Sequence, residues 1–462
     1  MRFAASLISP VRREPVLYVA LGAIVLLAVS VRLVFASAYE GSQGWGVQVV
    51  INANIAHNLA RGEGYYASVS PALHDASSAA DPPLTWEEAK AFPEAPLQRP
   101  IAYYLPGYPY LAASLWQLTG WETYGALQVT QAVVDGALGS VSVFVLLAVS
   151  GRRRAGLIAM LGYALAPPLI IQSALVLPDS LASSTNLLVL AFVAGGFATG
   201  RVYAGAIAAG LALGLGSWLR GDSIALVPFL LLAVLALGLW PLQTRLRWSG
   251  AFLVAWAVPV LCLGLFFQQV YGELHLTRPG AGILLWEGIG QQDNPWDIVA
   301  PPGRNLDAAA LALLQPQGLE YGTWRADNFL RDEAVRHMQS RPGWFIAPTL
   351  KRFWRVTTLQ KPPEAATNLP GTVASASRIA GPFLLPLAAL GLWLARGSPL
   401  LRNLLLVAWL SRVLPFSFLR DELRFEILIV AVYVVLLAVV VDEALTRAGG
   451  VRPADQEPRA VA

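Results

Sequence analysis

Apolar stretches recur along the chain, and each is long enough to cross the ~30 Å hydrocarbon layer of a membrane as a helix. Only 13% of the residues are charged and 56% are hydrophobic, whereas soluble domains are about one quarter charged. The sequence therefore predicts an all-α, multi-pass membrane protein with about ten transmembrane helices. The expected spans are 16–36, 126–149, 155–173, 181–199, 203–219, 222–241, 250–271, 379–396, 399–417 and 425–445.

The first of these stretches has features of a signal peptide as well as of a membrane helix. A basic segment precedes it, and it ends in the small residues FASA (35–38). At about 20 residues, however, it is longer than the usual apolar core of a signal peptide. It also contains Arg32. We therefore expect it to be the first transmembrane helix.

Two long polar intervals interrupt the apolar stretches and suggest a division of the chain into three parts. Residues 1–271 form an N-terminal transmembrane module, which includes the first polar interval at 37–125. Residues 272–378 form a large extracytoplasmic loop. Residues 379–462 contain the last transmembrane helices and a short cytoplasmic tail.

Arginines in the short connections predict the orientation of the chain, because cytoplasmic loops carry an excess of Arg and Lys. The short connections of the opposite end hold only Arg220, Arg420 and Arg424. We therefore expect both termini in the cytoplasm, both polar intervals outside, and the protein in the cell (inner) membrane. The arginines at the expected cytoplasmic end are Arg12, Arg13, Arg152, Arg153, Arg154, Arg201, Arg245, Arg247, Arg396, Arg402, Arg447 and Arg452.

The polar intervals themselves contain helical patterns. Apolar residues within 45–66 recur at helical spacing, which predicts an amphipathic helix on the membrane that stops at RGEG. The apolar segment 105–120 is short, so it is either an interfacial or re-entrant helix or the start of a tilted second span. In the second interval, 327–358 predicts two helices separated by Pro342 and Gly343.

Several classes of site are not indicated by the sequence. The single cysteine, Cys262, lies in an apolar stretch and is most simply a small buried hydrophobic residue. The four histidines are far apart, so no metal-binding motif is visible. The net charge of +4 comes from scattered clusters that mark topology, and we expect no nucleic-acid partner.

Ionisable residues from distant parts of the chain collect at the expected outer membrane face. Such charges are costly unless they pair or serve a site. Arginines suit a lipid-linked phosphate because they donate bidentate hydrogen bonds, and a carboxylate can take a proton from an acceptor hydroxyl or amine. The residues are Glu40 after the first span, Asp179 before another, Arg220 and Asp222 in SWLRGDS, and Arg420, Asp421, Glu422, Arg424 and Glu426 before the last span.

Each of these residues also has a structural interpretation. Asp179 follows a proline and would suit the N-cap of its helix, where a carboxylate favours the helix dipole, and Asp222 has the same explanation. The arginines near helix ends, including Arg32, could extend toward the headgroups. Asp135 lies deeper in an apolar stretch, and we expect it to make a structural hydrogen bond to a neighbouring helix.

Six segments, in this order along the chain, resemble the polyprenyl-phosphate-sugar-dependent glycosyltransferases of the GT-C superfamily. That group includes protein O-mannosyltransferases and aminoarabinose–lipid A transferases. The segments span most of the chain. They are IAHNLARGEGYY (55–66), YYLPGYPYLAASLWQLTG (103–120), ALVLPDSLASSTNLLVL (174–190), LGSWLRGDSIALVPFLLL (215–232), RPGWFIAPTLKRFWRV (341–356) and FSFLRDELRFEILIVAVYVVLLA (416–438).

The resemblance implies an outward-facing active site with an acidic residue in the first outer loop. Here Gln48 and Asn52 stand where that acid and a tyrosine would be expected, and the nearest upstream carboxylate is Glu40. Asp179 matches the second acidic position. The resemblance thus makes Glu40 and Asp179 the catalytic candidates. Arg32, Arg220, Arg420 and Arg424 match basic positions for the donor phosphate, and His57, Asp222 and Glu422 are further cleft candidates.

The function that follows is transfer of a sugar from a polyprenyl-phosphate carrier to an acceptor at the outer face. A single displacement would invert the anomeric carbon. The acceptor could be a protein, a lipid or a glycan; a divalent metal held by the two acids stays possible, although no metal motif is needed. Two alternatives remain: a transporter or lipid flippase, and a non-catalytic member of the same fold, which the missing first-loop acid suggests.

Overall fold

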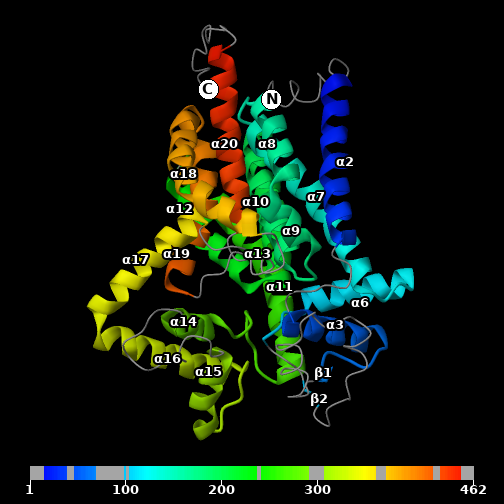
Figure 1. Cartoon of the computed structure of the whole chain (residues 1–462), viewed down its shortest axis with the longest axis vertical. Helices are drawn as coiled ribbons and strands as arrows, with labels where there is room; N and C mark the ends of the chain where they lie inside the picture. Colours follow the sequence, from blue (N-terminus) through cyan, green and yellow to red (C-terminus); the bar gives the residue numbers. More distant parts are fainter. Residues whose placement is uncertain are drawn as a thin grey trace.

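The computed structural model describes residues 15–38, 46–68, 98–99, 103–236, 241–290, 306–359, 371–419 and 427–448. A bundle of long helices is covered at one end by a layer of shorter helices (Figure 1). Seven helices of the described residues are long and apolar enough to cross a membrane. They are α2 (Pro15–Ala38), α7 (Tyr124–Ala148), α10 (Asp179–Thr199), α11 (Val202–Leu219), α13 (Leu242–Tyr271), α19 (Pro399–Phe418) and α20 (Ile427–Ala448).

The other three expected spans are also helical, but they are bent or shorter. α8 (Arg153–Leu165) and α9 (Pro167–Ala174) together could form an eighth span, bent by 52° where the prolines at 167 and 168 interrupt the helical hydrogen bonds. The remaining two contain the short 3₁₀ helix η2 (Gly221–Ala225) with α12 (Leu226–Ala236), and α18 (Gly371–Leu394) with the 3₁₀ turn η5 (Ala395–Gly397). The described residues of all ten apolar stretches are therefore mainly helical, and the all-α multi-pass fold class is confirmed.

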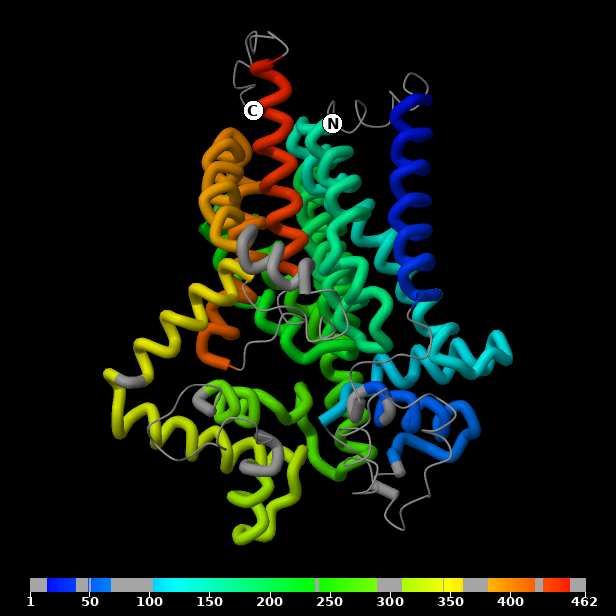
Figure 2. The backbone as a smooth tube through the Cα atoms, in the orientation of Figure 1, coloured from blue at the N-terminus to red at the C-terminus, as the bar shows by residue number. Residues whose placement is uncertain are grey.

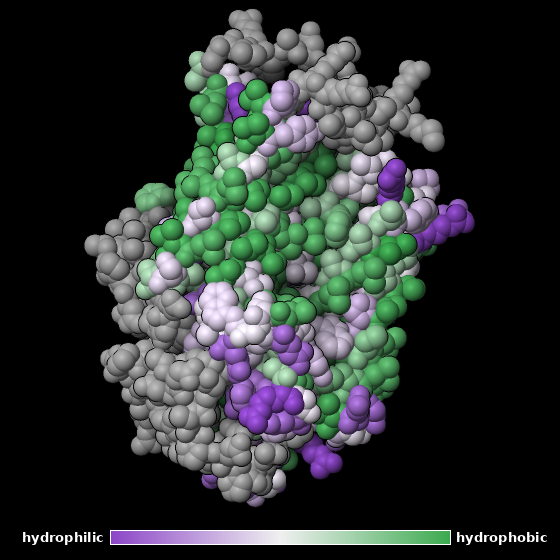
Figure 3. All heavy atoms as spheres, turned by 90° about the vertical axis from the view of Figure 1, so that its right-hand side faces the viewer, coloured by the Kyte–Doolittle hydropathy of each residue, from purple (hydrophilic) through white to green (hydrophobic). Residues whose placement is uncertain are grey.

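The bundle has the polarity of a protein that sits in lipid. On α2 only Ala28, Arg32 and Ala36, spaced one turn apart, are buried against the bundle. In the face shown in Figure 3, hydrophobic residues cover the length of the bundle and hydrophilic residues gather toward its lower part. Small residues allow close packing, as is usual between membrane helices. A Cβ added to Gly210 of α11 would lie 2.4 Å from the carbonyl oxygen of Phe252 on α13.

The first polar interval contributes α3 (Gly46–Ala60), α6 (Gly107–Thr119) and two short paired strands, β1 (Ala67–Ser68) and β2 (Gln98–Arg99). α6 lies across the lower end of the bundle, as an interfacial helix would (Figure 1). The prediction that α3 lies on the membrane with one apolar face is wrong. One side packs on α6 through Val49, Ala53 and Ala56, and Ile51 and Ile55 pack on Tyr65 and Ala67.

The second polar interval forms a small helical layer of its own. It contains α14 (Ala281–Gly290), α15 (Leu306–Leu314), the 3₁₀ turn η3 (Gln315–Gln317), α16 (Trp324–Ser340) and α17 (Pro342–Thr358). Two helices form as predicted, but they meet at Arg341, and Pro342 and Gly343 begin α17 instead of separating the helices. The Asp327 carboxylate of α16 accepts hydrogen bonds from the backbone N–H groups of Gly280 and Ile283 and fixes the start of α14.

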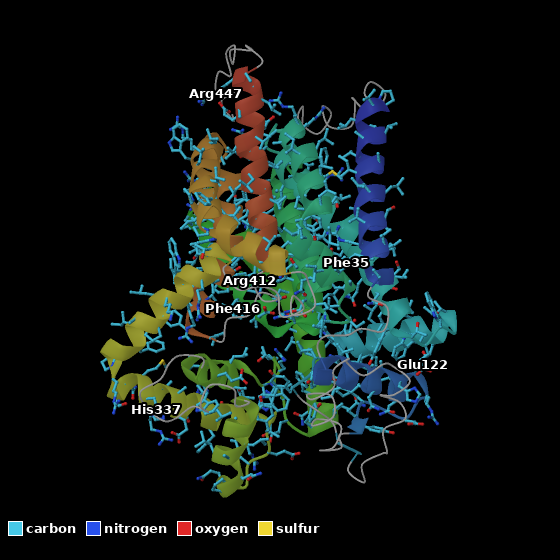
Figure 4. All side chains as sticks on the ribbon, in the orientation of Figure 1. Phe35, Glu122, His337, Arg412, Phe416 and Arg447 are labelled. Atoms are coloured by element: carbon cyan, nitrogen blue, oxygen red, sulfur yellow. The ribbon has the colours of Figure 1, made fainter. Side chains whose placement is uncertain are left out.

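The first residues of α2 and the last residues of α20 lie at the same end of the bundle, opposite the helical layer (Figure 2). We call the end that meets α3, α6 and α14–α16 the outer end. Figure 4 shows Arg447 at the far end, Arg412 where the bundle meets the layer, and Glu122 and His337 within or beside the layer. The arrangement is that expected for an even number of spans with both polar intervals on one side.

Candidate functional site

Asp179 lies where the chain enters the bundle at its outer end. α9 ends at Ala174, a short extended connection follows, and α10 begins. The N-cap residue is Pro178, so the expectation that Asp179 caps its helix is wrong: Asp179 is the first helical residue. Its carboxylate remains in the first turn, where the helix dipole favours a negative charge, and it pairs with an arginine from a different helix.

That arginine is Arg220, the residue that ends α11. Its Nη1 contacts Asp179 Oδ1. Its Nε and Nη2 donate to the two carboxylate oxygens of Asp222, at 2.9 and 3.1 Å. The fork of the guanidinium thus holds Asp222 in a bidentate pair while its remaining amino group reaches Asp179. Arg220 and Asp179 are 41 positions apart in the sequence, and Arg220 links Asp179 to Asp222.

Two further arginines that the sequence analysis did not single out belong to the site. Arg412 of α19 donates from Nη1 to Asp222 Oδ2 and approaches the backbone oxygen of Asp222 at 3.4 Å. Arg278 donates to the backbone oxygen of Tyr103 at 2.8 Å and lies over the ring of that tyrosine. The available signal for Arg412 was its charge inside the expected span 399–417, because an ionisable residue within a membrane helix is a functional candidate.

The site is a nearly water-excluded network of charges. The side chains of Asp179 and Arg412 are 2% and 5% exposed, and that of Arg220 is 11% exposed. Arg220 and Arg412 pair directly with the two carboxylates, and Arg278 lies beside them as a third guanidinium. Burial of charges is expensive, but mutual hydrogen bonds between opposite charges offset the loss of water. The network therefore holds its members in fixed places, and removal of one member would leave another buried charge unpaired.

Two hollows meet at the Asp179–Arg220 pair. The first, which we call the arginine hollow, is narrow and partly open to solvent, with room for about one water molecule. The second, the tyrosine hollow, contains about 530 Å³ of empty space, also partly open. Asp179 and Arg220 line both. The arginine hollow is also lined by Ala182, Ser183, Asp222, Arg412, Ile427 and Leu428, and the tyrosine hollow by Asn52, Tyr103, Tyr104, Leu105, Tyr108, Pro178, Leu219 and Arg278.

Buried polar atoms in and beside the arginine hollow lack partners among the described residues. Arg412 Nε has no hydrogen-bond acceptor, although Arg412 as a whole is only 4% exposed. The hydroxyl of Ser183, one turn after Asp179 on α10, is also unpartnered and buried. A buried donor without a partner costs about 1–3 kcal/mol. The arginine hollow thus presents donors that a ligand with acceptor oxygens could satisfy.

Arg32, expected from the resemblance to contact the donor phosphate, lies elsewhere. It is fully buried between α2, α7 and α8. Its Nε donates to Asp135 Oδ2 at 2.8 Å, and its other nitrogens reach backbone oxygens of Ala28, Tyr163 and Ala164. Because the Arg32 guanidinium is fully buried and hydrogen-bonded, it is not accessible to a phosphate and does not extend toward the headgroups. The expected structural role of Asp135 agrees with this pair.

His57 also lies apart from the charge network. Its Nδ1 contacts Glu122 Oε1 in the connection between α6 and α7, and His57 lines neither of the two hollows. Figure 4 shows Glu122 at the outer side, away from Arg412. Asp222, another cleft candidate, does line the arginine hollow. The candidates Glu40, Arg420, Glu422 and Arg424 lie outside the described residues.

No metal site is formed by the described part of the chain. No group of three or more His, Cys, Asp and Glu side chains that could hold a metal ion occurs among these residues. Asp179 and Asp222 are the two carboxylates of the network, and arginines engage both of them. The described part of the site is therefore a set of arginines paired with two carboxylates.

Comparison with known proteins identifies the fold. The archaeal oligosaccharyltransferase AglB from Archaeoglobus fulgidus, in complex with an inhibitory peptide and a dolichol-phosphate, matches with a TM-score of 0.53 at 14% identity; the match covers 95% of this chain and 52% of that chain. The Archaeoglobus fulgidus oligosaccharyltransferase tethered with an acceptor peptide matches with a TM-score of 0.54 at 16% identity, over 96% and 52% of the two chains. The apo form of that enzyme matches similarly, at 0.52.

This chain therefore shares its membrane fold with the oligosaccharyltransferase over most of its own length. It spans about half the length of the oligosaccharyltransferase. No protein-family model matches the chain, and no curated protein sequence does.

Proposed function

We propose that the protein is a membrane glycosyltransferase that moves a sugar from a polyprenyl-phosphate carrier to an acceptor at the extracytoplasmic face. The outer end of the bundle would face the periplasm or exterior, with both termini in the cytoplasm, because the arginine-rich short connections lie at the other end. The three parts of the chain would then be a transmembrane module at 1–271, an outer loop at 272–378 and C-terminal helices at 379–462.

The observation that carries this proposal is the arginine hollow. Arg412 has a buried Nε–H without an acceptor, beside the unpartnered hydroxyl of Ser183. A phosphate oxygen is an acceptor that suits both groups. Ile427 and Leu428 at the start of α20 line the same hollow, so an isoprenoid chain could leave it along apolar side chains. The match to a protein solved with a dolichol-phosphate supports a lipid-linked donor.

The reaction that this geometry suits is a direct displacement. A lone pair on the acceptor attacks the anomeric carbon, the bond from that carbon to the phosphate oxygen breaks, and its electron pair stays on the phosphate. The acceptor proton passes to a carboxylate, either Asp179 or Glu40. Arg412 and Arg220 stabilise the negative charge that develops on the departing phosphate. A single displacement inverts the configuration of the anomeric carbon.

The Asp179–Arg220 pair suggests that the donor binds before Asp179 acts as the base. In the structure Arg220 engages one oxygen of the Asp179 carboxylate. A donor phosphate that binds beside Arg412 offers Arg220 an alternative anionic partner. If Arg220 turns toward the phosphate, the Asp179 carboxylate is released to face the tyrosine hollow, where an acceptor would bind. Binding of the donor would thereby prepare the base.

The tyrosine hollow is the proposed acceptor site. Tyr103, Tyr104 and Tyr108 provide aromatic surface, and Asn52 and Arg278 provide polar groups. Such a mixture suits a peptide or a sugar, and the peptide complexes of the oligosaccharyltransferase favour a protein acceptor. A lipid or glycan acceptor remains part of the proposal because this chain spans only half of that protein. The sugar itself, hexose or pentose, is left to experiment.

Transfer by the purified full-length protein tests the proposal. Proteoliposomes would be supplied with polyprenyl-phosphate and polyprenyl-diphosphate sugars carrying a labelled sugar, together with peptide, lipid and glycan acceptors. We expect the label to move to an acceptor with release of the carrier phosphate. Translocation of the intact labelled lipid without transfer would instead indicate a flippase. Absence of both transfer and translocation, with bound donor, would indicate a non-catalytic member of the fold.

Replacing Arg412 with Met is expected to weaken donor binding. The change removes the unpartnered Nε–H and one charged contact to Asp222 while Arg220 still pairs with Asp222. A charge-assisted hydrogen bond contributes about 1.5–3 kcal/mol, which corresponds to roughly 10- to 100-fold in affinity. The dissociation constant of polyprenyl phosphate would be measured by competition. Arg402→Met, at the opposite end of α19, is the matched control; an equal loss in both variants would contradict the assignment.

A further inference from the structure

We propose that Gln128, Gln131 and Asp135 of α7, here called the α7 polar stripe, are positioning residues that set the place of Asp179. The inference rests on the proposed function, in which Asp179 acts on the acceptor. The three residues stand three and four positions apart, so they lie on one face of α7. They are 1%, 1% and 2% exposed. Polar side chains so deeply buried in a membrane bundle require partners.

Gln131 holds the connection that leads to Asp179. That connection leaves helical geometry after α9, so the carbonyl oxygens of Leu175 and Leu177 need donors from outside the helix. The Gln131 amide nitrogen donates to the backbone oxygens of Leu175 and Leu177 at 2.8 and 3.1 Å. It also reaches Ser180 Oγ, the residue after Asp179, at 3.3 Å. One amide group therefore fixes the chain immediately before and after the proposed base.

The orientation of the Gln131 amide is itself fixed. The hydroxyl of Tyr108, which lines the tyrosine hollow, donates to Gln131 Oε1. The amide oxygen of Gln131 therefore faces α6, and its amide nitrogen faces the connection. One turn earlier, Gln128 donates to the backbone oxygen of Ala174 at 2.8 Å, at the end of α9. The stripe thus also links the connection to the wall of the proposed acceptor site.

Asp135 anchors α10 one turn further into the bundle. One of its carboxylate oxygens accepts from the hydroxyls of Tyr163 and Ser184, and Ser184 lies five residues after Asp179. The other oxygen accepts from Arg32 Nε. Arg32 in turn contacts the backbone oxygens at the end of α8, next to the break between α8 and α9. A cation there suits the helix C-terminus, so the same cluster stabilises the bend that leads to the connection.

These contacts can position a carboxylate more finely than packing alone. The start of α10 is tied at Ser180 and at Ser184, and the connection is tied at Leu175 and Leu177. A displacement of about 1 Å in a reacting group can cost on the order of 100-fold in rate. Loss of the Gln131 donors would let the connection relax while the outer ends of α19 and α20 stay in place. Catalysis should then suffer more than donor binding.

The test is a double-mutant cycle in proteoliposomes. Gln131→Met keeps the length of the side chain but removes both the donors and the acceptor. We expect it to lower kcat about tenfold or more in the unsubstituted background, while the dissociation constant of polyprenyl phosphate changes less than about twofold. In the Asp179→Asn background, the same substitution should have almost no further effect, because it acts through Asp179. An equal fold-loss in both backgrounds would overturn the proposal.

Val143→Ala, which removes buried apolar volume from the same helix, controls for general loosening. If Val143→Ala lowers kcat, it should do so by the same factor in the unsubstituted protein and in the Asp179→Asn protein. A second readout does not depend on turnover. The infrared spectrum of each protein, minus the spectrum of the same protein with Asp179→Asn, gives the carboxylate band of Asp179. We expect Gln131→Met to shift this band and Val143→Ala to leave it unchanged; an unshifted band in Gln131→Met would overturn the positioning role. Absence of transfer by the unsubstituted protein would overturn the proposed function separately.

Discussion

Replacing Asp179 with Asn is expected to reduce the turnover number by about 10²- to 10⁴-fold, the usual contribution of a general base. Asn keeps nearly the size of Asp but cannot take the acceptor proton. The loss should appear in kcat, while the dissociation constant of polyprenyl phosphate stays similar or falls, because Arg220 is released from its pair with Asp179. Initial rates of label transfer in proteoliposomes, at saturating donor, measure the effect.

A matched control for this substitution exists at the other end of the bundle. Asp442 on α20 also pairs with an arginine, Arg154 of α8, and Asp442→Asn removes the same charge from the same kind of contact. Its rate should stay within a factor of about two to three of the unsubstituted protein, because an exposed pair contributes only about 0–1 kcal/mol. Glu40→Gln distinguishes the two candidate bases. Full activity in both Asp179→Asn and Glu40→Gln would remove the catalytic assignment.

The second large effect concerns stability. Asp135→Leu leaves the Arg32 guanidinium buried without its counterion, since Arg32 is fully buried and its Nε donates to Asp135. Breaking a buried pair by removing one partner typically costs about 3–5 kcal/mol. We therefore expect a markedly lower unfolding temperature for Asp135→Leu in detergent, or failure to accumulate in the membrane. Thermal unfolding followed by tryptophan fluorescence would measure the change.

The double variant Arg32→Met with Asp135→Leu shows whether stability falls because the ion pair is lost or because an unpaired charge stays buried. Replacing both members of a buried ion pair with apolar residues is often close to neutral, so the double variant should recover most of the lost stability. The Tyr163 and Ser184 hydroxyls lose an acceptor in both variants. If the double variant is no more stable than Asp135→Leu alone, the unpaired charge is not the cause of the destabilisation.

The position and order of the apolar helices were predictable from sequence because hydrophobic length is a local property, although seven or eight of the described helices, and not ten, are long and apolar enough to span a membrane. A stretch of about 20 apolar residues has few alternatives in a membrane, where backbone groups must be satisfied within the helix. The break in the expected span 155–173 was less visible, although the prolines at 167 and 168 signal it. The burial of α3 on two sides was not predictable from its own pattern, because one side packs on α6 further along the chain while the other packs on Tyr65 and Ala67 just after α3.

The site was predictable in part. Asp179, Arg220 and Asp222 were marked as outer-end charges, and the structure joins them in one network. Arg412 was missed because it lies within an apolar stretch that was assigned as a span. Arg32 was assigned to the phosphate because the resemblance placed it at a basic position of the family. Its partner Asp135 is 103 residues away, and only the packing of α2 on α7 brings the two together.

The central claim is that the buried charge network at the outer end holds a lipid-linked phosphate. An experimental structure of the full-length protein with polyprenyl phosphate in lipid nanodiscs tests it most directly. We predict that the phosphate lies within hydrogen-bond distance of Arg412 or Arg220, with the isoprenoid chain leaving past Ile427 and Leu428. A phosphate bound elsewhere, for example at the arginines near 152–154 at the opposite end, with the arginine hollow unoccupied, would contradict the account.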